Sequence, residues 1–168
     1  AGLLGYSYTC PDMIGGGQFT SFLNIDANAF DQALIVRSTQ VHALMPMMQF
    51  SVAPWRILNK ENLQTVKNMA RLHESMSSYI LQYAKHAAAT GEPIVRHMEY
   101  TFPHEGFAEC NDQFMLGDKY MVTPVVTSEN SRKVKLPKGL WKDDHDKRHK
   151  GGRTIEIEVP LDRLPYFE

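Results

Sequence analysis

The sequence predicts an α/β protein in which a parallel α/β part is followed by a small antiparallel β part. Two observations carry this prediction. Residues 1–92 give a strand, helix, strand and helix in that order, which is the pattern of parallel α/β folds. From Pro93 onward, short segments rich in β-branched residues alternate with turn residues. We therefore place a domain boundary between residues 92 and 93.

The first part begins with a predicted buried strand over residues 2–9 (GLLGYSYT) and a glycine-rich loop over residues 10–21. A helix is expected over residues 24–45, because its apolar residues recur at helical spacing. The short apolar run at residues 46–53 (PMMQFSVA) predicts a second buried strand.

A single long helix is expected over residues 62–90. Apolar residues form one stripe along it, from Leu63 to Ala87, and Gly91 and Pro93 follow it. Glycine after the last turn and proline shortly beyond it are the usual end of a helix, so the first part should close there.

The second part is expected to be β-rich. Strands are predicted within the segments PIVRHMEYTFP, KYMVTPVVT, RKVKLPKG and RTIEIEVPLD. The strict alternation in TIEIEV indicates that one face of its sheet is exposed to water. Between these strands, residues 136–152 (LPKGLWKDDHDKRHKGG) are expected to form a charged loop rich in turns.

Composition limits the kinds of partner. The formal net charge of the 168 residues is −1, with cations and anions interspersed, which argues against nucleic acid or an anionic membrane as main partner. A neutral, polar small molecule fits better. Cys10 and Cys110 are too few for a disulfide framework, so two free thiols are expected. His145 and His149 lack a third ligand nearby, which favours a solvated loop over a metal site.

Two residues stand out as candidates for chemistry. Asp12 follows a predicted buried strand and precedes three glycines, and the carboxyl ends of parallel strands are where ligands bind. The competing interpretation is that Asp12 caps the following turn. Trp55 follows Pro54 and could offer a flat face to a sugar ring, or instead pack in the core or at a domain interface.

Several motifs in a fixed order resemble those of glycoside hydrolase family 31. GYSYTCPDMIGGG is similar to the family stretch ending in Asp-Ile-Gly-Gly-Phe, and VRSTQVHALMPMMQFS is similar to its Arg-Trp-x-Gln helix and following strand. TGEPIVRHMEYTFP, DQFMLGDKYMVTPVV and VKLPKGLWKD resemble three further family segments. The resemblance covers nearly the whole chain. The run PMMQFSVAPWR resembles the branch that includes myogenesis-regulating glycosidase and α-galactosidase-type members.

This resemblance implies an architecture and an activity. Residues 1–92 would be the last β/α units of a (β/α)8 TIM barrel, and residues 93–168 would be the β-rich domain that follows it. The parent would be a retaining α-glycosidase for α-linked glucosides or galactosides that uses neither metal nor organic cofactor. Its two catalytic carboxylates would lie upstream of this chain, which would then contain no catalytic residue and be inactive alone.

The resemblance also implies a binding site. Asp12 matches a sugar-side aspartate of the family, while Gln49 and Ser51 stand where typical members have Arg and His. We therefore expect Asp12, Gln49 and Ser51 to form a pocket wall, with Trp55 as a further sugar contact. The partners would be a carbohydrate substrate and the remainder of the same enzyme or a second copy. The alternative is a non-catalytic carbohydrate-binding or assembly module that stacks sugars on Trp55 or Trp141.

Overall fold

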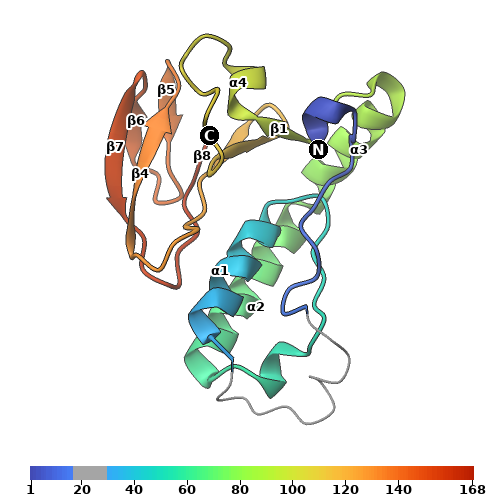
Figure 1. Ribbon diagram of the computed structural model, residues 1–168, viewed down its shortest axis with the longest axis vertical. Coiled ribbons are helices and arrows are strands. Elements are labelled where there is room, and N and C mark those ends of the chain that lie inside the picture. Colours follow the sequence, from blue (N-terminus) through green and yellow to red (C-terminus); the bar gives the residue numbers. More distant parts are fainter. Residues whose placement is uncertain (17–29) are drawn as a thin grey trace.

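The computed structural model describes residues 1–16 and 30–168 (Figure 1). Helices occupy the first half: η1 (Gly2–Leu4), α1 (Gln32–Ala43), η4 (Pro54–Arg56), α2 (Lys60–Ser75) and α3 (Ser77–Thr90). The second half contains β1 (Val95–His97), α4 (Met98–Thr101), β2 (Phe114–Leu116), β3 (Tyr120–Val122), β4 (Ser131–Leu136), β5 (Leu140–Lys142), β6 (Arg148–Lys150), β7 (Arg153–Glu158) and β8 (Tyr166–Phe167).

Local side-chain contacts explain where the helices begin and end. The Asp31 carboxylate accepts a hydrogen bond from the Leu34 amide at the start of α1, and Asn59 caps α2 in the same way. Helix α3 ends at Gly91, whose φ of 80° lies in the left-handed region, as the sequence predicts. The start of the helix expected over residues 24–45 and part of the glycine-rich loop fall outside the described residues.

The prediction of one helix over residues 62–90 is wrong, because the chain breaks at Met76 into α2 and α3. The hydroxyls of Ser75 and Ser77 on either side donate to the carbonyl oxygens of Leu72 and Glu74. Serine side chains that bond to nearby carbonyls compete with the helical pattern. Helix α3 therefore sets off in a new direction from α2 (Figure 1).

The strands predicted over residues 2–9 and 46–53 do not form. Residues 2–4 form a 3₁₀ turn, and the pairing that exists is one isolated parallel bridge between Ile14 and Phe50. A strand needs neighbours along its length to satisfy its backbone groups. Among the described residues, no strand pairs with either segment, although residues 2–7 lie beside the start of β1.

The antiparallel β-rich second part is confirmed. Strands β1, β2, β3 and β8 form one antiparallel sheet in that order, while β4 pairs with β7 and β5 with β6. Two details differ from the sequence prediction. The segment PIVRHMEYTFP turns into α4 after three strand residues, because the His97 ring caps the new helix. The predicted charged loop contains the β5–β6 hairpin, whose inward residues Trp141 and His149 are buried.

Strand β8 joins two of these sheets. It pairs with β3 through Val122 and Tyr166, and its neighbour Glu168 exchanges two backbone hydrogen bonds with Lys142 on β5. The β1–β2–β3 sheet and the β5–β6 hairpin therefore meet along this last segment, next to the C-terminus in the upper part of Figure 1.

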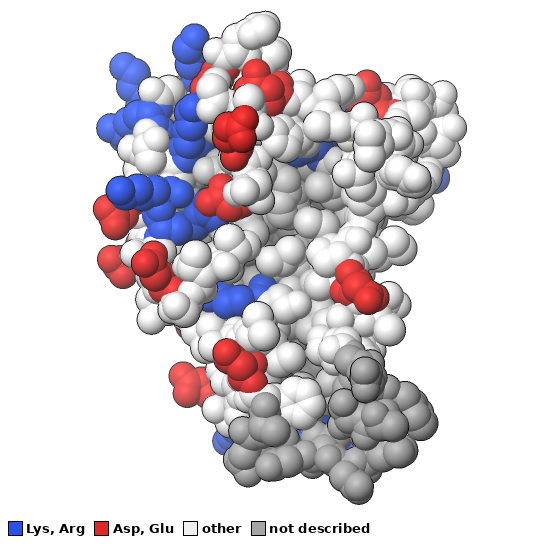
Figure 2. All heavy atoms as spheres, in the orientation of Figure 1, with Lys and Arg blue, Asp and Glu red and all other residues white. Residues whose placement is uncertain are grey.

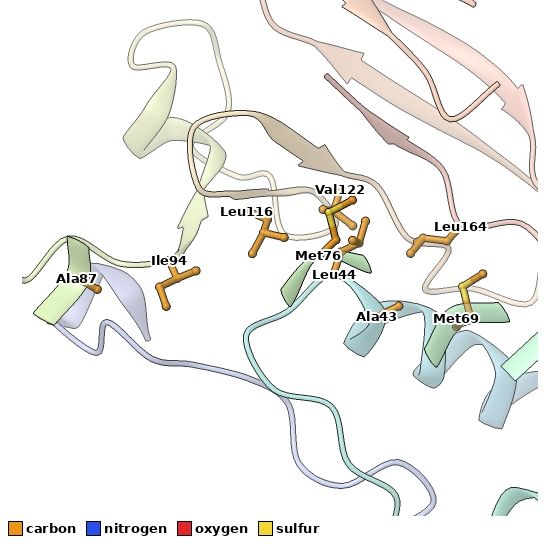
Figure 3. Close-up of a cluster of buried hydrophobic side chains, with 9 residues drawn as sticks. All are labelled: Ala43, Leu44, Met69, Met76, Ala87, Ile94, Leu116, Val122 and Leu164. Atoms are coloured by element: carbon orange, nitrogen blue, oxygen red, sulfur yellow. The ribbon is translucent and has the colours of Figure 1, made fainter. Parts of the chain in front are cut away.

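The helices and the β1–β2–β3–β8 sheet share one hydrophobic core (Figure 3). Leu44 and Ala43 at the end of α1 meet Met69 and Met76, and the sheet contributes side chains that face them. The sheet-side members are Ile94, Leu116, Val122 and Leu164. A second cluster lies inside the β-rich part, and a third surrounds Ile14. The two parts of the chain therefore share apolar contacts with each other.

The surface is unevenly charged. Figure 2 shows Lys and Arg gathered over the β4–β7 side of the molecule, with Asp and Glu more scattered. Among the described residues, no helix has the length and apolar character needed to cross a bilayer.

Candidate functional site

Residues 12–16 and 49–51 run parallel to each other next to α1. The Ile14 amide donates to the Gln49 carbonyl oxygen at 3.0 Å, and the Ser51 amide donates to the Ile14 carbonyl oxygen at 2.9 Å. These two bonds on either side of Phe50 are the pattern of a parallel ladder. The two segments therefore have the same direction, although each is too short to form a regular strand.

The packing around this bridge indicates which side chains face away from the helices. Ile14, Phe50 and Val52 pack with Ile35 of α1 in one hydrophobic cluster. Because side chains alternate along an extended chain, Gln49 and Ser51 point to the opposite side. Gln49 is exposed and Ser51 is half-buried, and neither side chain bonds to another described residue. Their polar groups are thus available to a ligand.

Asp12 has a local role in the structure. Its Oδ1 accepts a hydrogen bond from the Met13 amide at 2.7 Å, one residue along the chain, whereas an Asx turn would use the amide two residues along. Its backbone carbonyl oxygen lies 2.5 Å from Nε2 of His42 on α1. The side chain is exposed, and its Oδ2 bonds to none of the described residues, so one carboxylate oxygen remains available.

The two tryptophans differ in environment. Trp55 is 72% exposed, so it does not pack in the core of the described residues, and a place at a domain interface of the parent stays a prediction. Trp141 is 8% exposed, donates from Nε1 to the Pro137 carbonyl oxygen at 2.9 Å and lies edge-on to Phe102. Trp141 therefore has no free face for stacking on a sugar, whereas Trp55 has one.

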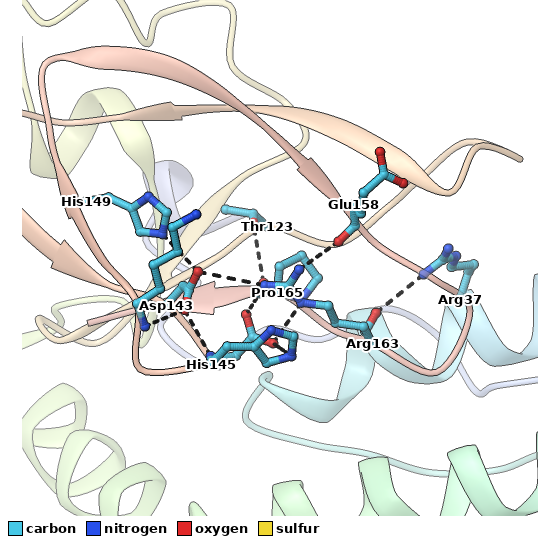
Figure 4. Close-up of polar contacts among 10 residues, drawn as sticks. Arg37, Thr123, Asp143, His145, His149, Glu158, Arg163 and Pro165 are labelled. Atoms are coloured by element: carbon cyan, nitrogen blue, oxygen red, sulfur yellow. Dashed lines mark hydrogen bonds and ion pairs between the residues drawn. The ribbon is translucent and has the colours of Figure 1, made fainter.

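Both histidines of the β5–β6 hairpin contact Asp143, His149 through its ring and His145 through its backbone amide. His149 is buried and its Nε2 lies 2.8 Å from Asp143 Oδ2, which corrects the prediction that it is solvated (Figure 4). Asp143 Oδ1 accepts from the amides of His145 and Lys147, which shapes the turn. Burial raises the pKa of Asp143, but hydrogen bonds from His149, Lys147 and His145 outweigh it and hold that pKa below its usual value.

Next to this pair, Asp144 forms a two-pronged contact with Arg163 at 2.9 and 2.8 Å. Within residues 1–16 and 30–168, no three His, Cys, Asp or Glu side chains are grouped as a metal ion would need. Cys10 and Cys110 are both free, as expected.

One contact of the site escaped the sequence analysis. His42 reaches the backbone of Asp12 across 30 residues, and nothing in its local pattern distinguishes it from an ordinary helix-edge histidine. Arg37 and Gln40 are the Arg and Gln of the Arg-Trp-x-Gln motif, but the motif does not predict their contacts with residues 129–163. Long-range polar contacts of this kind have no periodic signal in a sequence.

Comparison with known proteins identifies the family. Residues 91–168 match the model of the glycosyl hydrolase family 31 C-terminal domain. The mouse (Mus musculus) myogenesis-regulating glycosidase is 33% identical over 98% of this chain. The chain belongs to glycoside hydrolase family 31.

Further relatives and structures of the family agree. The neutral α-glucosidase C of Mus musculus is 27% identical over 88% of the chain. A family 31 dextranase from Flavobacterium johnsoniae, solved with isomaltotriose, is 28% identical over 84% of the chain with a TM-score of 0.78. The chain spans 24%, 18% and 18% of these three proteins, so it corresponds to less than a quarter of each family 31 relative.

Proposed function

We propose that this family 31 chain is the C-terminal segment of a retaining α-glycosidase that acts on α-linked glucosides or galactosides. Residues 1–92 would supply the last β/α units of its barrel, and residues 93–168 the β-rich domain that follows. Retention needs two carboxylates about 5–5.5 Å apart. Both would belong to the part of the parent that precedes Asp12.

The observation that carries this proposal is the parallel bridge between Ile14 and Phe50. In a β/α barrel, neighbouring strands run parallel, with one set of side chains toward the helices and the other toward the interior. Ile14 and Phe50 pack toward α1, which directs Gln49 and Ser51 to the side where a barrel interior would lie. Asp12 lies at a bend just before this bridge, and its exposed carboxylate would join the same wall.

Apolar side chains exposed in the first part are consistent with missing barrel neighbours. Several large ones are at least 42% exposed near the bridge and the N-terminal segment: Leu3, Leu4, Tyr6, Tyr8, Met13 and Met47. Contiguous exposed apolar surface commonly marks an interface. The remainder of the parent enzyme or a second copy of the chain would cover it.

Gln49 and Ser51 would set the sugar preference. A site built to hydrogen-bond one hydroxyl rejects an epimer because the mismatch leaves buried polar groups unpaired. In typical members a histidine occupies the Ser51 position, and the smaller hydroxyl leaves room for a different orientation of sugar hydroxyls. Ser51→His in the complete enzyme should therefore shift the ratio of kcat/KM for aryl α-glucosides and α-galactosides toward the glucosides. An unchanged ratio would remove Ser51 from the specificity site.

The test of the proposed function uses the chain and its parent. The purified chain should hydrolyse no aryl α-glycoside, while Asp12→Asn in the complete enzyme should lower kcat/KM at least about tenfold by removing a charged contact. Glu109→Gln is the control, because Glu109 is also an exposed carboxylate but lies on the β-rich part, away from α1. Turnover by the isolated chain that Asp12→Asn abolishes would refute the proposal.

The exposed Trp55 face favours one alternative, a non-catalytic carbohydrate-binding module. Titration calorimetry of the chain with mono- and oligosaccharides separates the two functions. Millimolar or tighter binding that is lost in Trp55→Ala and retained in Asp12→Asn would favour the module. Binding that needs Asp12 as well would favour the glycosidase pocket.

A further inference from the structure

We propose that Arg37, Gln40 and His42 act together as positioning residues, through which the β-rich part of the chain holds Asp12 in place. This inference rests on the proposed function, because the position of Asp12 matters to catalysis only if it belongs to the sugar pocket. All three residues lie on α1 within two turns of each other. Arg37 and Gln40 face the β-rich part, whereas His42 lies on the other side of the helix and faces Asp12. We refer to them as the α1 relay.

Arg37 fixes α1 to the β-rich part. Its side chain is buried, and Nη2 donates to the Val159 carbonyl oxygen at 2.8 Å and to Asn130 Oδ1 at 3.3 Å. Nη1 lies 3.4 Å from the carbonyl oxygens of Pro160 and Arg163, and Figure 4 shows the guanidinium directed at this segment. Burial lowers the pKa of Arg37, and the Asp162 charge opposes that change. A ring of carbonyl oxygens thus compensates a cation taken out of water.

Gln40 completes the attachment one turn along the helix. It is fully buried, its Nε2 donates to the Leu161 carbonyl oxygen at 2.7 Å, and its Oε1 accepts from Arg37 Nη1 at 3.0 Å. The two side chains therefore support each other and bond to consecutive carbonyl oxygens of residues 159–161. Because both bonds are directional, they fix the rotation of α1 about its axis as well as its distance from the β-rich part.

His42 connects the same helix to Asp12. Its ring is buried, with Nε2 at 2.5 Å from the Asp12 carbonyl oxygen and Nδ1 at 2.7 Å from the Ser38 carbonyl oxygen. Both ring nitrogens face carbonyl oxygens, which can only accept, so the link to Asp12 forms in a state of the ring that carries a proton on Nε2. Ile35 of α1 also packs against Ile14. A rotation of α1 would therefore move the backbone of residues 12–14, and Arg37 with Gln40 prevents that rotation.

Amide hydrogen exchange of the native chain tests the relay, since it reports local opening segment by segment. In Arg37→Met, exchange should rise about tenfold in residues 158–164 and also at the Ile14 and Gly16 amides, which are bonded in the native structure. In His42→Leu, exchange should rise at Ile14 and Gly16 while residues 158–164 keep the native rate. Arg37→Lys should give an intermediate effect, because an ammonium cannot reproduce the guanidinium fork.

The matched control is Arg132→Met. Arg132 is about as buried as Arg37 and bonds to Asp112 and Pro124 inside the β-rich part, away from α1. Its replacement should speed exchange around residues 110–134 and leave Ile14 unchanged. The exchange rates of the α3 amides serve as an internal reference for global unfolding. If Arg37→Met also raises the exchange rates in α3, the milder variant Arg37→Lys is used to test the relay. The relay is overturned if neither Arg37 variant speeds exchange at Ile14 beyond the α3 reference.

Enzyme kinetics of the same variants distinguish the relay from the proposed role of Asp12 in the sugar pocket. In the complete parent enzyme, the relay predicts that Arg37→Lys and His42→Leu raise KM for an aryl α-glycoside, since both displace Asp12. Exchange as expected with unchanged kinetic constants would overturn the role of Asp12 in the sugar pocket and leave the relay standing. Changed kinetics without changed exchange at Ile14 would overturn the relay itself.

Discussion

Replacing Leu116 by alanine should destabilise the fold by about 3 kcal/mol. Leu116 lies on β2 in the shared core, is 0% exposed and faces the helices (Figure 3). The change removes three carbon groups, each worth about 0.8 kcal/mol of transfer free energy. The cavity left between sheet and helices adds to that loss and brings the value into the usual range for buried leucines, about 2–5 kcal/mol.

Urea unfolding followed by circular dichroism measures this change at constant m-value. The matched control is Leu140→Ala, because Leu140 is also a strand leucine but is 83% exposed, and its replacement should change stability by less than about 0.5 kcal/mol. If the two variants lose the same amount, or if Leu116→Ala loses less than about 1 kcal/mol, the helices and the sheet do not share the core described above.

Three further predictions concern single residues. Because Asp143 has a lowered pKa, its charge stabilises the fold above the unfolded value of about 3.9, and the stability difference between wild type and Asp143→Asn should shrink as pH falls from about 5 to 2; a constant difference would exclude the charged pair. Gly117→Ala should destabilise by at least about 1 kcal/mol, because Gly117 has a φ of 59° and a Cβ there would collide with the Tyr79 hydroxyl; thermal melts would show it, and an unchanged Tm would contradict the contact. Iodide should quench the fluorescence of Trp55 and spare that of Trp141, and equal quenching of Trp55→Phe and Trp141→Phe would contradict their different exposure.

The parts of the fold that the sequence predicts well are those with a periodic or capping signal. In TIEIEV, the isoleucines pack on the second hydrophobic cluster while the residues between them stand opposite lysines of β4 or are exposed, and the segment forms most of β7. Gly91 ends α3 as expected. The break at Met76 was not predictable from the apolar stripe, which continues through it, because hydroxyl groups compete locally for helix carbonyls. The β5–β6 hairpin was hidden because its two buried side chains alternate with charged ones.

The first part shows a different limit. An apolar run such as residues 46–53 does not say whether partners lie beside it, and without them it forms one bridge instead of a strand. For the candidate site, motif positions gave Asp12, Gln49 and Ser51, and alternation next to Phe50 gave the side on which the last two lie. The boundary between residues 92 and 93 and the binding roles of these residues stay predictions. The link from Asp12 to His42 could not be predicted, since it depends on how α1 packs.

The position of β8 has a consequence for biosynthesis. The edges of β3 and β5 stay unpaired until residues 166–168 have been synthesised. These residues are made about 25 residues after β5. A nascent chain stalled at residue 160 would carry two half-built sheets with open hydrogen-bonding edges. Such edges attract other chains, so premature termination in this short stretch should produce aggregates and not a smaller working domain.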